Sequence, residues 1–144
     1  SDQFSKRGKT IHSAALESIE TYTNLHTFYV QFLCNRLFGD FKQVTSNEVD
    51  RTILTIVKEN EPIYANYLNL LTTTQYKTLR AIALEGRVTN PTAAQFLAKH
   101  SLGAHSSVSQ AIDSLLKKEF LSEESDGLLL QDKFFAQWIR MKTG

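Results

Sequence analysis

The chain lacks several features that would assign a protein to a class at once. Its single cysteine, Cys34, can form no internal disulfide, and its apolar neighbours at helical spacing predict a buried, unreactive thiol. No run approaches the ~20 apolar residues of a membrane span, and the N-terminus lacks the basic-then-apolar pattern of a signal peptide. With 16 Lys and Arg against 15 Asp and Glu, the net charge of +1 provides no bulk attraction to DNA. We therefore expect a soluble cytoplasmic protein, without a membrane partner, in which any nucleic-acid contact depends on a local patch.

Residues for phosphoryl transfer and for metal binding are also missing. A P-loop needs two glycines ahead of its lysine to hold the phosphates. Gly8-Lys9-Thr10 matches the end of such a loop, but Gln3 stands where the first glycine belongs and no apolar strand precedes it. The 4 histidines are scattered, without clustered Cys, Asp or Glu at ligand spacing. We expect no metal site, no catalytic residue and no enzymatic activity in this chain by itself.

Apolar residues at spacings of three and four predict helices in the first half of the chain. Two amphipathic helices are expected at about 12–22 and 26–38. A Thr-x-x-Glu capping box, Thr45 with Glu48, predicts the start of a third. Its apolar stripe continues for many residues, with a kink or a new helix start just before Pro62, which has no N–H to donate.

Capping signals predict three more helices in close succession, followed by a hairpin and a terminal helix. The hairpin has its turn at Asp126-Gly127. The terminal helix carries Phe134, Phe135 and Trp138, which we expect to close a core rather than to bind a partner. The three expected helix starts are Thr72 with Gln75, Thr92 with Gln95, and Ser106.

This order of elements is the winged variant of the helix-turn-helix plan. The predicted fold class is therefore mainly α, with a small helical bundle at 1–71 and a winged helix-turn-helix domain at 72–144 that contains a two-stranded β-hairpin.

The third helix of the winged domain would present a polar face to a partner. Small hydroxyl residues and a glutamine could reach base edges or phosphates, and the lysines could meet a phosphate backbone. Against DNA, the wing carries Glu123, Glu124 and Asp126, which would repel phosphate. Both double-stranded DNA and a protein partner stay open, with protein docking favoured. The candidate binding residues are Ser106, Ser107, Ser109, Gln110, Ser114, Lys117 and Lys118.

Several segments resemble the C-terminal region of prokaryotic AAA+ ATPases related to archaeal ATPases and to the initiator-like and STAND groups. The stretch His26-Thr27-Phe28-Tyr29 is similar to the Gly-His-Pro-Tyr-like motif of their helical lid, with Asn24-Leu25 in place of the usual glycine and Thr27 in place of proline. The segments similar to their winged helix are Leu71-Thr72-Thr73-Thr74-Gln75, Pro91-Thr92 before Phe96-Leu97, Gly103-Ala104-His105-Ser106-Ser107-Val108 and Asp132-Lys133-Phe134-Phe135-Ala136-Gln137-Trp138.

The resemblance implies a non-catalytic, regulatory C-terminal region of a larger ATPase. Residues 1–71 would be the helical lid, with His26 and Thr27 near ATP bound by a missing N-terminal ATPase core. Residues 72–144 would dock a protein or DNA. ATP would be the cofactor of the parent protein and not of this chain. The alternative is a DNA-binding transcription regulator in which the first helices form a dimerisation domain.

Overall fold

The chain divides into two compact units, Ser1–Asn60 and Glu61–Gly144. The computed structural model describes residues 10–11, 13–23, 27–40 and 43–143, which form eight α-helices and two small sheets. No helix within these ranges is long and apolar enough to cross a membrane. The mainly helical fold expected from the sequence is confirmed.

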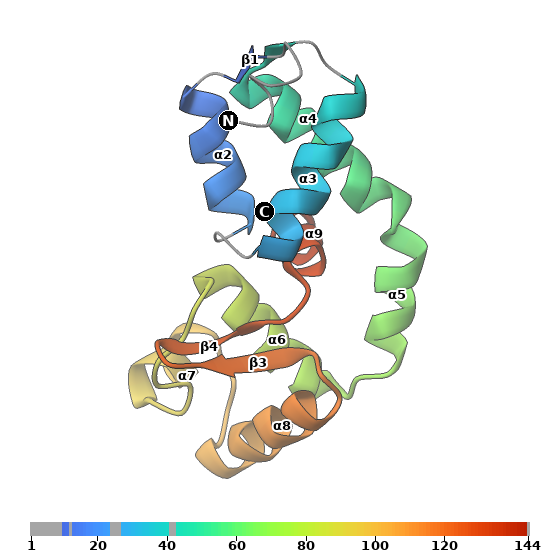
Figure 1. The fold of residues 1–144 in the computed structure, drawn as a ribbon. Helices are drawn as coiled ribbons and strands as arrows, with labels where there is room; N and C mark the ends of the chain where they lie inside the picture. Colours follow the sequence, from blue (N-terminus) through green and yellow to red (C-terminus); the bar gives the residue numbers. More distant parts are fainter. Residues whose placement is uncertain (1–9, 12, 24–26, 41–42, 144) are drawn as a thin grey trace. The chain divides into compact units, whose positions relative to one another are not determined.

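The first unit is a bundle of three helices with a minimal parallel sheet (Figure 1). Two strands of two residues pair in parallel, with Thr10 opposite Gln43 and Ile11 opposite Val44. The sequence did not predict these strands, because two residues are too few for an alternating pattern. The elements are β1 (Thr10–Ile11), α2 (Ser13–Thr23), α3 (Thr27–Asp40), β2 (Gln43–Val44) and α4 (Ser46–Glu59).

The core of this unit forms where α2 and α3 pack against α4. Each helix contributes aliphatic side chains that are almost fully buried, among them Ala15 and Ile19 of α2, Leu33 and Leu37 of α3, and Val49, Ile53, Ile56 and Val57 of α4. Cys34 is half-buried rather than buried, and this burial raises the pKa of its thiol. The thiolate, which is the reactive form, is therefore disfavoured.

The predicted start and end of α4 are both confirmed. The capping box is formed by the Glu48 carboxylate, which accepts from the Thr45 backbone N–H at 3.0 Å, and by the Thr45 side chain, which faces the Glu48 backbone N–H. The Thr45 hydroxyl also donates to the Glu48 carboxylate. At the other end, the Asn60 side-chain amide donates to the Ile56 carbonyl at 2.8 Å. A new helix then begins just before Pro62, where a proline costs no helical hydrogen bond.

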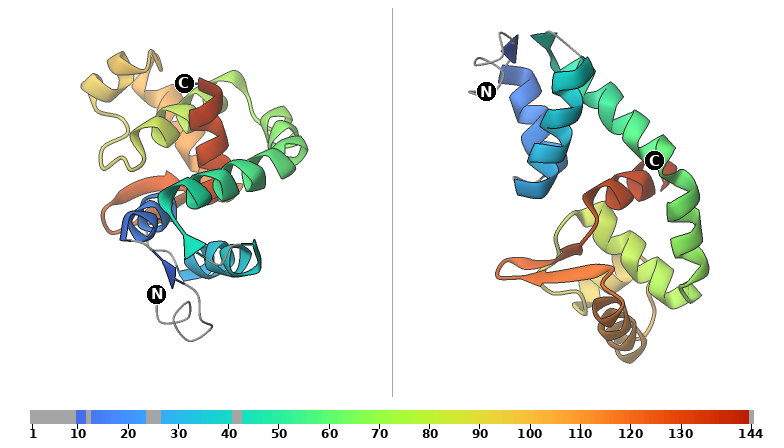
Figure 2. Two further views of the ribbon diagram at one scale, coloured as in Figure 1. Left: turned by 90° about the horizontal axis from the view of Figure 1, so that it is seen from above. Right: turned by 45° about the vertical axis from the view of Figure 1, so that its right-hand side comes forward.

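The second unit contains four helices, a hairpin and a terminal helix, and from the second of these helices onward the order is the one that the sequence predicted (Figure 1). Figure 2 shows the hairpin running beside α8, which contacts β3. The elements are α5 (Glu61–Asn69), α6 (Thr73–Glu85), α7 (Ala94–Lys99), α8 (His105–Lys117), β3 (Leu121–Glu124), β4 (Gly127–Leu130) and α9 (Lys133–Thr143).

The position of α5 differs from the expected boundary after Leu71. Tyr64 of α5 lies with its ring 5.3 Å from Phe135 and 5.6 Å from Trp138 of α9. Trp138 also donates its indole N–H to Glu61 at 3.2 Å. Because an aromatic cluster joins α5 to α9, α5 belongs to the second unit, which begins at Glu61. Phe135 and Trp138 are 1% and 5% exposed, so they close the core as expected.

Two of the three predicted helix starts in this unit differ from the structure. The box of Thr72 and Gln75 is present, with Gln75 N–H donating to Thr72 Oγ1 at 3.2 Å and Thr72 N–H to Gln75 Oε1 at 3.1 Å. The predicted cap by Thr92 and Gln95 is wrong, because α7 begins at Ala94 without a side-chain cap. Ser106 is likewise not a cap, since it lies inside the first turn of α8.

A carboxylate at the end of α6 ties it to α7. Glu85 Oε1 lies 2.7 Å from Lys99 Nζ and 2.8 Å from His100 Nε2. These hydrogen bonds hold the pKa of the Glu85 carboxyl below its ordinary value.

A single residue of the loop after α6, Val88, pairs with the hairpin as an isolated antiparallel bridge. β3 and β4 pair antiparallel, with Leu121 opposite Leu130. Val88 N–H donates to the Leu128 carbonyl at 2.9 Å, and Leu128 N–H donates to the Val88 carbonyl at 2.8 Å. Gly127 is the first residue of β4 and not part of the turn, which is formed by Ser125 and Asp126.

Candidate functional site

The amphipathic pattern of α8 gives the winged unit one buried and one exposed helix face. Val108 and Leu115 are fully buried, and Ala111 and Ile112 nearly so. The residues predicted to face a partner lie on the other side of the helix. Four of them are exposed, namely Ser106, Ser107, Gln110 and Lys117, and a fifth, Ser109, is half-buried.

The other two candidate residues contact α6 instead. Gln75 donates from Nε2 to Ser114 Oγ at 3.0 Å. Lys118 Nζ lies 3.3 Å from both the Leu70 carbonyl and Gln75 Oε1. The Gln75 side chain therefore closes the cap of α6 and at the same time holds the C-terminal end of α8. Ser114 and Lys118 therefore make hydrogen bonds within the unit, and Lys118 stays exposed to solvent.

The wing is acidic, as predicted, but the sequence did not reveal its basic partner. Arg87 follows α6, and its guanidinium lies 2.7 Å from Asp126 Oδ2 and 3.5 Å from Glu124 Oε2. All three side chains are partly exposed, so these ion pairs contribute ~1 kcal/mol or less each. No salt bridge of the described residues involves Glu123.

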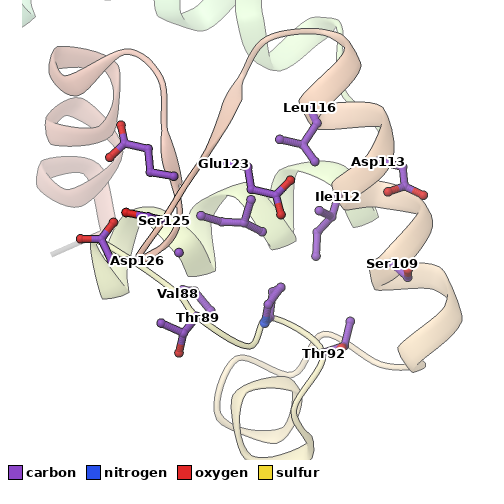
Figure 3. A pocket seen from close by; sticks show the side chains of 14 residues that line it. Val88, Thr89, Thr92, Ser109, Ile112, Asp113, Leu116, Glu123, Ser125 and Asp126 are labelled. Carbon is purple, nitrogen blue, oxygen red and sulfur yellow. The ribbon is translucent and has the colours of Figure 1, made fainter.

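A groove of about 410 Å³ lies between α8, the loop after α6 and the hairpin (Figure 3). Its floor includes the apolar side chains of Val88, Ile112 and Leu128, which are each 6–7% exposed, and polar groups make up the larger share of its exposed surface. Figure 3 shows Glu123 of the hairpin pointing into the space that Ile112 and Leu116 of α8 also face. The lining contains four carboxylates, those of Asp113, Glu123, Glu124 and Asp126.

The groove brings together residues that the sequence had placed in separate elements. Asp113 lies on the exposed face of α8 and Glu123 in the wing, and both line the groove. Ser109 is the one candidate binding residue that also lines it. Val88 and the loop after it were missed, because a single paired residue leaves no periodic signal.

The predicted nucleotide contacts fall largely outside the described residues. The predicted contacts were His26 and Thr27: His26 lies outside the described residues, and at Thr27 only the backbone, as the first residue of α3, is described. Outside the described residues are also Asn24 and Leu25 of the lid motif, Gly8 and Lys9 of the incomplete P-loop match, and His12. Within the described ranges, no group of three or more His, Cys, Asp or Glu residues could hold a metal ion.

The order of elements and the paired wing define the second unit as a winged-helix domain. Residues 62–141 match the family described as "Probable winged helix domain", which spans more than half of the chain. The chain belongs to this family. No curated protein and no solved structure matches it. The family match begins within α5, in agreement with the aromatic cluster that joins α5 to α9.

Proposed function

We propose that the winged-helix unit docks a protein partner through the groove between α8 and the β3–β4 hairpin. The observation that carries the proposal is the acidic lining of this groove. In helix-turn-helix proteins the recognition helix enters the major groove, and neighbouring elements contact the phosphates. Here the lining of the space beside the helix contains four carboxylates and no lysine or arginine, and only two of these carboxylates, Glu124 and Asp126, pair with the nearby Arg87. These carboxylates would repel the phosphates of DNA, whereas a protein surface that carries basic residues would complement their charge.

The hydrogen bonds of α8 support the same choice. A DNA reader uses basic side chains of this helix on the phosphate backbone. Lys117 and Lys118 are both exposed, but Lys118 Nζ already lies 3.3 Å from the Leu70 carbonyl and from Gln75 Oε1, which leaves Lys117 as the lysine of α8 itself. A single lysine beside four carboxylates makes a weak phosphate contact.

Two measurements on the full chain test docking against DNA binding. Titration of duplex DNA at low ionic strength should show no saturable binding. A photo-crosslinking amino acid at Ser109, in the groove, should trap protein in cells. The same group at exposed Ala65 of α5 is the control and should not give that product. Saturable DNA binding that weakens with salt and with Lys117→Ala would refute docking and favour the transcription-regulator alternative.

We propose further that this region is the non-catalytic C-terminal part of a larger ATPase. The support is the resemblance of residues 26–34 and 71–138 to the lid and winged helix of AAA+ proteins, together with the helical bundle of α2, α3 and α4. In this proposal an ATPase core outside these residues binds ATP, with His26 and Thr27 at the nucleotide. The winged helix would then report the nucleotide state to its partner.

The test of this second proposal is nucleotide binding by the parent protein. It should bind ATP, and His26→Ala should weaken binding, because the lid motif contributes to the site. His105→Ala, at the exposed start of α8, is the matched control and should leave the ATP affinity unchanged. Unchanged affinity after His26→Ala, or a parent without a phosphate-binding loop, would overturn the ATPase assignment and leave the docking proposal intact.

A further inference from the structure

We infer that the groove between α8 and the hairpin takes a peptide segment in which an apolar side chain is flanked by lysine or arginine. This inference rests on the proposed docking function and names the chemistry of the partner. Two properties of the groove lead to it, apolar residues at its floor and an acidic rim.

The apolar residues at the floor of the groove favour a partner with an apolar side chain. Val88, Ile112 and Leu128 are almost buried, and the half-buried Leu116 and Pro91 extend the same surface. The volume of about 410 Å³ falls in the range of pockets that receive whole side chains or small ligands. A polar group placed against this surface would lose its hydrogen bonds to water without replacing them. An aliphatic or aromatic side chain would instead add buried apolar area.

The acidic rim favours a positively charged partner, mainly at the carboxylates that lie near α8. Arg87 already pairs with Glu124 and Asp126 at the tip of the hairpin. Asp113 and Glu123, on the helix wall and on the hairpin wall, have no salt bridge among the described residues, and both are exposed. A cation beside either carboxylate would therefore gain an ion pair without breaking an existing one.

Peptide geometry also fits the separation of these two features. In an extended peptide, side chains two positions apart point to the same side, so an apolar residue can enter the groove while basic residues two positions before and after it reach the walls. Lysine and arginine also have long aliphatic stems that can cover the apolar rim while their charges reach the carboxylates.

The experiment uses four synthetic peptides of equal length and the full chain. The first has a central leucine flanked by lysines, and the others replace the leucine by serine, the lysines by glutamates, or the lysines by serines. Binding is measured by fluorescence anisotropy at low and at moderate salt, and its location by NMR shift changes of the backbone amides. The first peptide should bind tightest, lose affinity with salt, and shift amides of Ile112, Leu128 and their neighbours.

Variants of the chain separate the groove from general charge. Glu123→Gln and Asp113→Asn should each lower the affinity for the first peptide roughly two- to fivefold, the range for exposed ion pairs. Glu119→Gln is the matched control, because Glu119 is equally exposed in the same unit but does not line the groove. It should leave the affinity within error. Leu116→Ala should also lower the affinity for the first peptide. A cooperative thermal unfolding transition is the control that this variant is folded.

The outcomes distinguish this inference from the docking function. If the serine-centred peptide binds as tightly as the first peptide, the requirement for an apolar side chain is overturned. If the glutamate-flanked peptide binds as tightly, the requirement for positive charge is overturned. An effect of Glu119→Gln equal to that of Glu123→Gln also overturns the charge requirement at the groove. No binding by any of the four peptides also overturns the inference. In each case the docking function still stands, provided that duplex DNA does not bind and the crosslink from Ser109 traps protein.

Discussion

The substitution Gly127→Ala tests how the wing is attached to the rest of the winged-helix unit. Gly127 has φ = +133°, a backbone conformation that residues with a side chain rarely adopt. A Cβ at this position would lie 2.7 Å from the Val88 carbonyl oxygen and 3.0 Å from the Val88 carbonyl carbon. Because backbone atoms make this contact, the clash cannot be relieved by a side-chain rotation. The strand pair between Val88 and Leu128 must move.

The expected cost follows from two terms. A side chain in a sparsely populated backbone region costs about 1–3 kcal/mol. Two hydrogen bonds join Val88 to Leu128, at 2.9 and 2.8 Å, and each contributes about 0.5–1.5 kcal/mol. Since the hairpin is partly exposed and can shift, we expect Gly127→Ala to lower the free energy of unfolding of this unit by about 2–4 kcal/mol, out of the ~5–15 kcal/mol of a typical domain.

The assay is urea unfolding followed by tryptophan fluorescence. The chain has 1 tryptophan, Trp138 of α9, so the signal reports on the second unit. Gly103→Ala is the control, because Gly103 also has a positive φ, +88°, but a Cβ there would meet no atom within 4 Å. It should cost only about 1 kcal/mol. Equal costs for the two variants would refute the steric argument, and so would unchanged hydrogen-exchange protection of the Val88 and Leu128 amides.

Three further predictions concern other contacts of the second unit. Gln75→Ala should lower the free energy of unfolding by about 1–2 kcal/mol, because it removes one half of a capping box and the contacts to α8, and thermal unfolding measures this. Trp138→Phe should cost about 1–2 kcal/mol, since it removes the bond to Glu61 and part of the aromatic cluster, and Glu61→Gln, which can still accept that bond, should cost less in the same urea assay. Because the pKa of Glu85 is lowered in the folded state, its contribution is fully present above the ordinary pKa of about 4.3 and is lost as the pH falls through the lowered value, so Glu85→Gln should flatten the loss of stability below about pH 4.

Helix positions were predictable because the signals that set them are local. Both capping boxes, the new helix before Pro62 and the order of helices and hairpin lie in short stretches of sequence, and the structure confirms each. The helix starts at Thr92 and Ser106 were wrong for a related reason. A capping residue is a weak signal where a loop is already shaped by other contacts, and α7 and α8 begin after Ala93 and Ala104 without side-chain caps.

The candidate site was predictable only in part. The exposed face of α8 and the acidic wing were both expected from the sequence. Their combination into one groove depends on Val88, whose pairing with Leu128 brings the loop after α6 against the hairpin. The role of Arg87 depends on the same pairing, because it lies far in sequence from Glu124 and Asp126.

The amino-acid sequence was sufficient to predict the order of the helices and the hairpin, the capped starts of α4 and α6, and the negative charge of the wing. These properties depend on residues close together in the chain, through periodicity, capping and composition. Three properties became visible only in the folded chain: α5 joins the winged-helix unit, Ser114 and Lys118 contact α6, and Asp113 and Glu123 line one groove with Ile112. Each of these depends on contacts between residues far apart in the chain, which helix periodicity and capping do not encode.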